Sequence, residues 1–154
     1  MAKPGKAIPD GFRTITPHIV VAGAAAAIEF YKKAFGAEVI RQMPGPGGNV
    51  MHAEIRIGDS IVMLNDEFPD YGALGPKSIG GTATTLHIYV NDADAFMDRA
   101  VKAGAEVAMP LMDMFWGDRY GKLKDPFGHH WSVATHKEDL TDAEVAERMK
   151  KEWK

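Results

Sequence analysis

An internal repeat constrains the fold of this chain more than any other feature of its sequence. Residues 16–19, Thr-Pro-His-Ile, return 69 residues later as Thr-Leu-His-Ile at 85–88, and Gly-Ala-Glu-Val at 36–39 returns unchanged, 68 residues later, at 104–107. Both matches fall at the same place in the same order of predicted elements, which is one strand, one helix and three strands. We therefore predict an α+β fold made of two tandem βαβββ modules.

The hydrophobic pattern locates the elements of these modules. Strands are predicted at 13–21, 38–43, 51–57, 60–65, 84–90 and 106–109, and two more lie within 119–134 around a turn at 125–128. Helices are predicted at 24–35 and 92–103, because each run is rich in helix formers and each is followed by glycine, at Gly36 and Gly104. Asp92 is the expected N-cap of the second helix.

A third helix is predicted near the end of the chain. Thr141 and Glu144 match a capping box for a helix that runs to about Lys151. On this helix Val145 and Met149 are four residues apart, which predicts one apolar stripe docked on the rest of the protein.

These elements divide the chain into segments. We predict a loose lead-in at 1–12, a single domain at 13–136 and a C-terminal helical extension at 137–154. The domain is divided into module one at 13–65, a connection at 66–82 that is rich in glycine and proline, and module two at 83–136.

Composition excludes several classes of function. The 154 residues have a net charge of −3, which argues against a nucleic acid or a membrane as partner because both require a concentrated positive field. No cysteine is present, so disulfides, thiolate metal sites and thiol nucleophiles are excluded. The first residues lack the apolar core of a signal peptide, and the longest apolar run, 19–28, is too short to span a bilayer. A cytoplasmic protein is expected.

Strand alternation separates an apolar face from a polar face in each module. The polar faces are predicted to carry His18, His52, Glu54, Arg56, Met63, Asn65, His87, Tyr89 and His130. If the two sheets curl toward each other, these side chains line a shared cup of the kind that binds small molecules. The alternatives are that each histidine is an ordinary half-exposed strand residue, and that Glu54 and Arg56 pair with each other or with cross-strand neighbours.

A soft apolar segment precedes the seventh predicted strand. It contains Met109, Met112, Met114, Phe115 and Trp116. This segment is interpreted either as a pliable wall or lid over the cup, since methionine and aromatic side chains adapt to varied ligands, or as edge packing or a dimer contact. His129 and His136, near the last strand, are expected on the surface.

Three segments carry a resemblance to a known family: AIEFYKKAFGAEV, MHAEIRIGDSIVML and FWGDRYGKLKDPFGHHWSVATH. Together with the repeat they resemble the glyoxalase/bleomycin-resistance/extradiol-dioxygenase (vicinal oxygen chelate) superfamily, and within it the PhnB-like branch, over about 13–136. The resemblance implies that the two βαβββ modules curl into an incomplete mixed β-barrel around a ligand cup, and that the protein forms a homodimer.

The resemblance also implies where a divalent metal would bind. Metal-dependent members hold the ion with His, Gln or Glu at four inward positions, which alignment assigns to Thr16, Met63, Thr85 and Ser132 of this chain. None of these side chains is a good ligand for Zn²⁺, Ni²⁺, Mn²⁺ or Fe²⁺, which argues against the family's glyoxalase I, extradiol-dioxygenase and fosfomycin-transferase activities. A shifted set of His18, His87 and Glu54, or His52 in place of Glu54, is the alternative metal site.

Three functions are compatible with these observations. The first is a metal-free, cofactor-free protein that binds a planar or amphipathic small molecule through His18, His52, Glu54, Met63, His87, Tyr89, Phe115, Trp116 and His130. The second is a lyase, isomerase or dioxygenase-type enzyme acting on a small vicinally oxygenated substrate, with a divalent metal at the shifted site, or with Glu54 or His52 as general base when no metal is bound. A third is a structural domain whose cup is a dimer seam. The sequence names neither the ligand nor the substrate.

Overall fold

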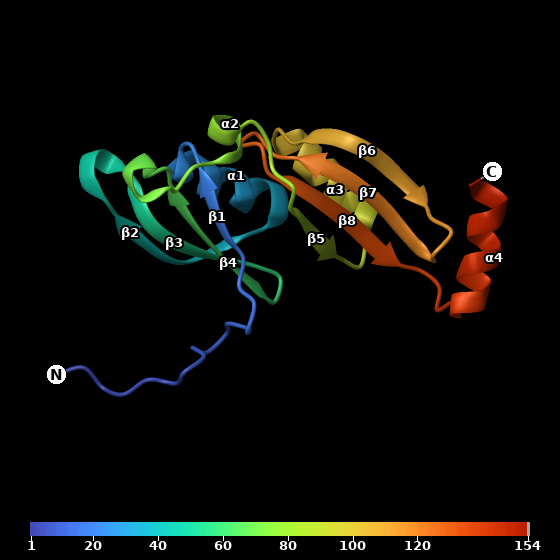
Figure 1. Ribbon diagram of the computed structural model, residues 1–154, viewed down its shortest axis with the longest axis horizontal. Helices are drawn as coiled ribbons and strands as arrows, with labels where there is room; N and C mark the ends of the chain where they lie inside the picture. The colour runs from blue at the N-terminus through green and yellow to red at the C-terminus, as the bar shows by residue number, and fades with distance from the viewer. Residues whose placement is uncertain (154) are drawn as a thin grey trace. The chain divides into compact units, whose positions relative to one another are not determined.

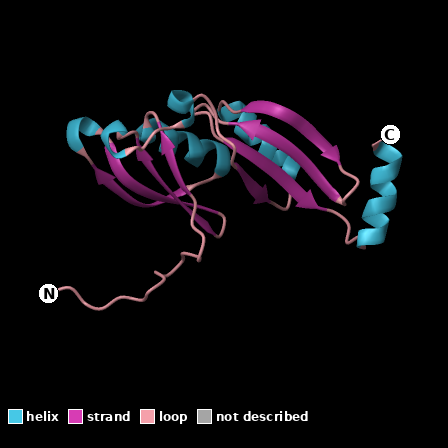
Figure 2. Cartoon of the chain, viewed as in Figure 1, coloured by secondary structure: helices cyan, strands magenta, loops and turns pink. Residues whose placement is uncertain are grey.

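The protein is described by a computed structural model over residues 1–153. The chain forms two compact units, Met1–Gly81 and a second unit that begins at Thr82. Each unit contains one βαβββ module with its own four-stranded mixed sheet, so the two modules predicted from the repeat are confirmed (Figures 1 and 2).

Module one is built in the predicted order. Its elements are β1 (His18–Val21), α1 (Ala24–Phe35), β2 (Glu38–Pro44), β3 (Val50–Ile57) and β4 (Ser60–Asp66). The sheet order is β1-β4-β3-β2, with β1 parallel to β4 and the other pairs antiparallel. Short helical turns follow at η1 (Pro46–Gly48), between β2 and β3, and at η2 (Pro69–Tyr71) and α2 (Pro76–Ile79) in the connection after β4.

Module two repeats this arrangement. Its elements are β5 (Thr85–Tyr89), α3 (Ala93–Ala103), β6 (Glu106–Asp113), β7 (Asp118–Lys124) and β8 (His130–His136), in the order β5-β8-β7-β6 with β5 parallel to β8. A last helix, α4 (Asp142–Glu152), stands at the end of the sheet where β8 finishes (Figure 1).

Each module has its core between one face of its sheet and its own helix. In module one, α1 packs on β1, β3 and β4 and buries Tyr31 and Ile28 with Ile55 and Leu64 of the sheet. In module two, α3 packs on β6, β7 and β8, and Trp131 and its neighbours form the buried layer. The opposite face of each sheet carries the polar side chains, as the alternation predicts.

Local signals set the helix ends as predicted. Gly36 and Gly104 both adopt the left-handed conformation that ends a helix, and Asp92 accepts a hydrogen bond from Ala95 N–H at the start of α3. Thr141 and Glu144 form the complete capping box of α4.

Three expectations change in the structure. The first strand begins at His18 rather than at residue 13, because Pro17 has no N–H to donate and the hydroxyl of Thr16 instead bonds to Arg13 C=O. The sixth strand continues to Asp113, since Pro110 is tolerated on the edge strand β6. The docked apolar stripe predicted on α4 is only partly formed: Val145 is half-buried and Met149 is 42% exposed, and no described residue of this helix is fully buried.

None of the helices within residues 1–153 is long and apolar enough to cross a membrane.

Candidate functional site

The polar face of module one brings together the histidines of two strands. His18 on β1 forms a short hydrogen bond with Asn65 Oδ1 on β4, and His52 Nε2 donates to Glu54 Oε2 on β3 at 2.8 Å. The rings of His18 and His52 meet edge to face with centroids 6.0 Å apart. Four polar side chains from three strands therefore form one cluster, of which Asn65 is the buried member.

Arg56 does not join this cluster. Its guanidinium donates to Glu38 on β2 at 2.8 Å, and the two residues are direct cross-strand partners. Glu54 is thus left to His52, with its side chain only 13% exposed. The arrangement makes His52 an oriented imidazole backed by a carboxylate, which is the form a general base takes.

The corresponding face of module two is aromatic. His87 on β5 bonds through Nδ1 to Ser132 Oγ on β8 at 2.6 Å. Its ring lies 4.4 Å from the ring of Tyr89 and is stacked on Tyr120 at 5.8 Å. Because these neighbours partly exclude water from the His87 ring, desolvation lowers the pKa of His87. The nearby carboxylate of Asp118 opposes this shift.

Ring contacts continue from His87 along the sheet. We define the aromatic row as Tyr89, His87, Tyr120, Trp116 and Phe115, joined in this order by successive ring contacts with centroids 4.4 to 5.8 Å apart. Its members come from β5, β7 and the turn between β6 and β7. Such a row presents both ring faces and ring edges to a bound molecule.

A buried carboxylate anchors this row. Asp118 on β7 is 4% exposed and accepts hydrogen bonds from the Tyr89 hydroxyl at 3.1 Å and from Trp116 Nε1 at 3.2 Å. The bond to Asp118 raises the pKa of Tyr89, because it favours the protonated phenol and the negative charge opposes a phenolate. Two rings of the row are therefore held in place by one side chain.

The same carboxylate binds His136 of the neighbouring strand β8. Asp118 Oδ1 lies 2.7 Å from His136 Nδ1, and His136 Nε2 lies 2.7 Å from Asp139 Oδ1. These bonds, first that to Asp139 and then that to Asp118, raise the pKa of His136. His136 is exposed, as expected, but its partners are not apparent from the sequence pattern.

A cavity of about 540 Å³, largely open to solvent, lies where the parallel strands β5 and β8 end. It is lined by Tyr89, Val90, Asn91, Thr135 and His136. Tyr89 is thus a member of the aromatic row and also a wall of the cavity, which has the size of a small-molecule site.

The strand register tests the family's metal positions. It pairs His18, rather than Thr16, with Met63, and His87, rather than Thr85, with Ser132. In each module a histidine therefore lies beside a poor metal ligand: His18 beside Met63, and His87 beside Ser132. Among the described residues no group of three or more His, Asp or Glu side chains is arranged to hold a metal ion. The residues within each module do not fit the metal site that the resemblance implies.

The predicted site residues fall into two groups. His18, His52 and Glu54 come together in module one, and His87, Tyr89, Phe115 and Trp116 come together in module two. Met63 and His130 lie on the same polar faces, beside His18 and Thr85 respectively. The shared cup, and a metal set of His18, His87 and Glu54, stay predictions.

Asp118 and Tyr120 are functional candidates that the strand alternation does not reveal. A signal for Asp118 was present, because the turn at 125–128 sets a hairpin register in which Asp118 pairs with His136.

Comparisons with known proteins give a consistent result. The sequence profile of the Glyoxalase/Bleomycin resistance protein/Dioxygenase superfamily matches residues 13–133. An uncharacterized protein of Mycobacterium tuberculosis (strain ATCC 25618 / H37Rv) is 46% identical over 138 residues, which cover 88% of this chain and 81% of that protein.

Two solved structures are similar in fold. TioX from Micromonospora sp. ML1 has a TM-score of 0.65 and 26% identity, covering 80% of this chain and 98% of that chain. A putative 3-demethylubiquinone-9 3-methyltransferase, a PhnB protein from Bacillus cereus, has a TM-score of 0.61 and 19% identity, covering 80% and 99%.

Proposed function

The chain belongs to the Glyoxalase/Bleomycin resistance protein/Dioxygenase superfamily, and on that basis we propose that it binds a planar aromatic small molecule. The binding surface is the aromatic row of module two together with the cavity beside it. The ligand is held without chemical change and without a metal cofactor. The protein acts in the cytoplasm as a homodimer, and neither nucleic acid nor membrane is a partner.

One observation carries this proposal, namely the continuity between the aromatic row and the cavity at Tyr89. A planar ligand would stack on rings that are already oriented, so little conformational entropy would be lost on binding. Asp118 supports this preorganisation because it fixes the ring edges of Tyr89 and Trp116. The cavity of about 540 Å³ is open to solvent and has room for a small molecule that also rests on the aromatic row.

The module-one cluster favours a second candidate function. A carboxylate-backed imidazole, His52 with Glu54 at 2.8 Å, is suited to abstracting a proton from a small oxygenated substrate. His18 and Asn65 would then supply polar contacts to that substrate. This alternative predicts turnover that is lost in His52→Ala and reduced in Glu54→Gln, whereas a binding protein shows neither turnover nor its loss.

The binding proposal is tested with two probes, acridine orange (a planar aromatic cation) and 8-anilinonaphthalene-1-sulfonate (an aromatic anion). Binding of either is measured by fluorescence and by isothermal titration calorimetry. Because aromatic stacking contributes about 1 kcal/mol per ring pair, Trp116→Ala and Tyr120→Ala are each expected to weaken binding about fivefold or more. Tyr71→Ala, at an exposed aromatic outside the row, is the matched control. Equal affinities in all four proteins would reject the aromatic row as the binding surface.

The metal-dependent alternative needs its own test. Elemental analysis of protein purified without a metal-affinity column, followed by rebinding of Zn²⁺, Ni²⁺, Mn²⁺ and Fe²⁺, measures the metal content directly. We expect far less than one ion per chain and probe binding that EDTA leaves unchanged. One ion per chain, lost in His18→Ala and in His87→Ala, would instead support the shifted metal site.

The expected homodimer is checked by size-exclusion chromatography with light scattering. A mass of twice 16.8 kDa is the expected result. A single-chain mass at all concentrations would reject it.

A further inference from the structure

The C-terminal helix α4 and the link before it contact module two through several polar groups. The helix lies outside the residues that match the family, and none of its described residues is buried. A contact between titratable groups changes with pH, whereas an apolar contact does not. The contacts that attach α4 to module two therefore decide whether its attachment depends on pH.

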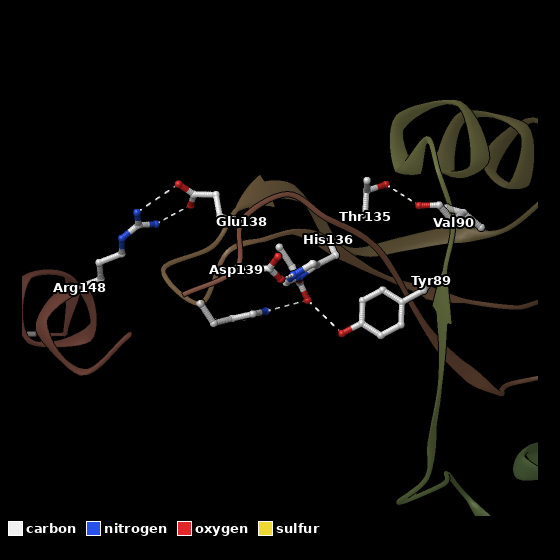
Figure 3. A network of polar contacts seen from close by, with 9 residues as sticks. Tyr89, Val90, Thr135, His136, Glu138, Asp139 and Arg148 are labelled. Carbon is white, nitrogen blue, oxygen red and sulfur yellow. Dashed lines mark hydrogen bonds and ion pairs between the residues drawn. The ribbon is translucent and has the colours of Figure 1, made fainter. Parts of the chain in front are cut away.

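The attachment is made at the turn between β6 and β7 and along α4. Gly117 C=O accepts hydrogen bonds from the backbone N–H groups of Lys137 and Glu138. The Glu138 carboxylate accepts two hydrogen bonds from Arg148 of α4, at 2.6 and 3.2 Å (Figure 3). A side chain could not replace the hydrogen of Gly117, because a Cβ there would lie 2.6 Å from Glu138 O.

Beyond α4, Trp153 reaches the aromatic row. Its ring meets the ring of Phe115 edge to face, with centroids 6.3 Å apart. Phe115 is the last member of the row, so Trp153 extends the proposed ligand surface by one ring. The position of α4 therefore sets whether the row ends at Phe115 or at Trp153.

His136 is the last residue of β8, where the link to α4 begins. It bonds to a carboxylate through each ring nitrogen, to Asp118 through Nδ1 and to Asp139 through Nε2. An ionised carboxylate only accepts hydrogen bonds, so both nitrogens must carry hydrogen and His136 must be an imidazolium. A neutral imidazole has one N–H and could donate to only one of the two carboxylates.

The two carboxylates differ in their access to water. The side chain of Asp118 is 5% exposed, whereas that of Asp139 is fully exposed. An unpaired carboxylate costs least where water can solvate it. When His136 loses a proton, the remaining one therefore stays on Nδ1 toward Asp118, and the bond to Asp139 is the one that breaks.

We propose that α4 is a proton-controlled latch on the ligand surface of module two, closed by the His136 imidazolium between Asp118 and Asp139 and loosened when His136 is neutral. In the closed state Trp153 adds to the aromatic row. In the open state the segment after β8 is freed at Asp139, and Trp153 leaves Phe115. The part of this inference that concerns the ligand rests on the proposed function.

The titratable and charged groups that face His136 come from three segments. They are Asp118 on β7, Asp139 in the link to α4, and Tyr89 on β5, which bonds to Asp118. The two carboxylates raise the pKa of His136 above its ordinary value of about 6.5. Since the raised pKa belongs to the folded, closed form, the stabilisation is complete below about pH 6.5 and is lost as the pH rises through the folded pKa.

The latch is tested by NMR on the full chain from about pH 5 to about pH 9. Imidazole ¹⁵N shifts report the protonation of His136, and amide shifts and exchange rates report residues 137–153. We expect the amides of α4 to follow the His136 titration and to lose protection about two- to fivefold, the range for one exposed ion pair. Titration of His136 while these amides stay unchanged would overturn the latch.

Two variants separate a latch from a merely structural role. In Asp139→Asn the amide can donate to a neutral His136, so α4 is expected to stay closed at every pH. In His136→Gln no imidazole titrates, so the pH dependence of the α4 amides is expected to disappear. Persistence of the wild-type pH dependence in either variant would also overturn the proposal.

The ligand part is read from acridine orange affinity. Wild-type affinity is expected to fall about two- to fivefold as His136 deprotonates, while Trp153→Ala is weak and independent of pH. If the affinity for acridine orange does not change with pH while α4 opens, the proposed regulation is wrong and the proposed function is unaffected. Absence of binding at any pH would reject the proposed function, and the NMR experiment would still decide the latch.

Discussion

The two modules repeat the same backbone but fix the start of their helices in different ways. In module one, Asp66 at the end of β4 accepts hydrogen bonds from the backbone N–H groups of Gly23, Ala24 and Val50, at 2.8 to 2.9 Å. In module two the equivalent residue, Thr135 at the end of β8, accepts only from Ala93 N–H. The missing contacts are partly replaced by Asp92, a local N-cap that α1 lacks.

This difference shows how a repeat can diverge while its fold is kept. The helix N-terminus needs acceptors for its unpaired N–H groups, but the acceptors can come from a distant strand or from the preceding residue. In module one a single buried carboxylate accepts from the helix N-terminus and also from the first residue of β3. Module two divides the task between two weaker groups. The polar faces diverge similarly, with a histidine–glutamate cluster in one module and an aromatic row in the other.

The largest effect is expected from Asp66→Ala. Three backbone donors would lose a charged acceptor in a buried site, which should lower the free energy of unfolding of module one by about 3 to 5 kcal/mol. Hydrogen exchange measured peptide by peptide would locate the loss in residues 18–66. Asp66→Asn, which keeps the shape, should lose less. If Asp66→Ala lowers the free energy of unfolding less than Thr135→Val does, the stated difference between the modules is wrong.

Thr135→Val is the matched change in module two. The valine keeps the shape but cannot accept from Ala93 N–H or donate to Val90 C=O, which should cost about 1 to 2 kcal/mol. Urea unfolding gives the total, and exchange of the α3 amides should give the location. If Thr135→Val lowers the free energy of unfolding as much as Asp66→Ala does, the two residues contribute equally and the modules do not differ in this respect.

Asp92→Ala removes only the local cap of α3. Loss of the bond to Ala95 N–H should cost about 1 kcal/mol, as for helix N-caps in general. The double variant with Thr135→Val sharpens the comparison, because both residues serve one helix terminus and their effects should exceed simple addition. Thermal unfolding of the single and double variants measures this coupling, and strict additivity would argue against a shared role.

The smallest effect concerns His87 and is a pH dependence. Because desolvation lowers its pKa, His87 should titrate below the ordinary value of about 6.5, and its neutral form stabilises module two above that pH. That stabilisation is lost as the pH falls through the folded pKa, opposite in direction to the effect of His136. Imidazole NMR resolves the two midpoints, and a midpoint for His87 above that for His136 would contradict both assignments.

Much of the fold could be predicted from the sequence because its signals are local. Strand alternation assigned His52 and Glu54 to one face of the sheet, and glycine and capping residues identified the helix ends. The family resemblance is confirmed by the profile match over 13–133. The aromatic row was found only in part, since Tyr120 joins it through a register across β7 and β8 that periodicity within one strand does not reveal.

The sequence by itself determined that the chain is a repeated βαβββ protein with polar, histidine-rich sheet faces, because side-chain alternation and helix capping act over a few residues. Tertiary structure alone decided which polar groups pair: Glu54 with His52 rather than Arg56, and Asp118 with Tyr89, Trp116 and His136 together. The physical reason is that a hydrogen bond needs its partners within about 3 Å in a suitable orientation. That condition depends on strand register and turn geometry, which bring together residues far apart in the sequence.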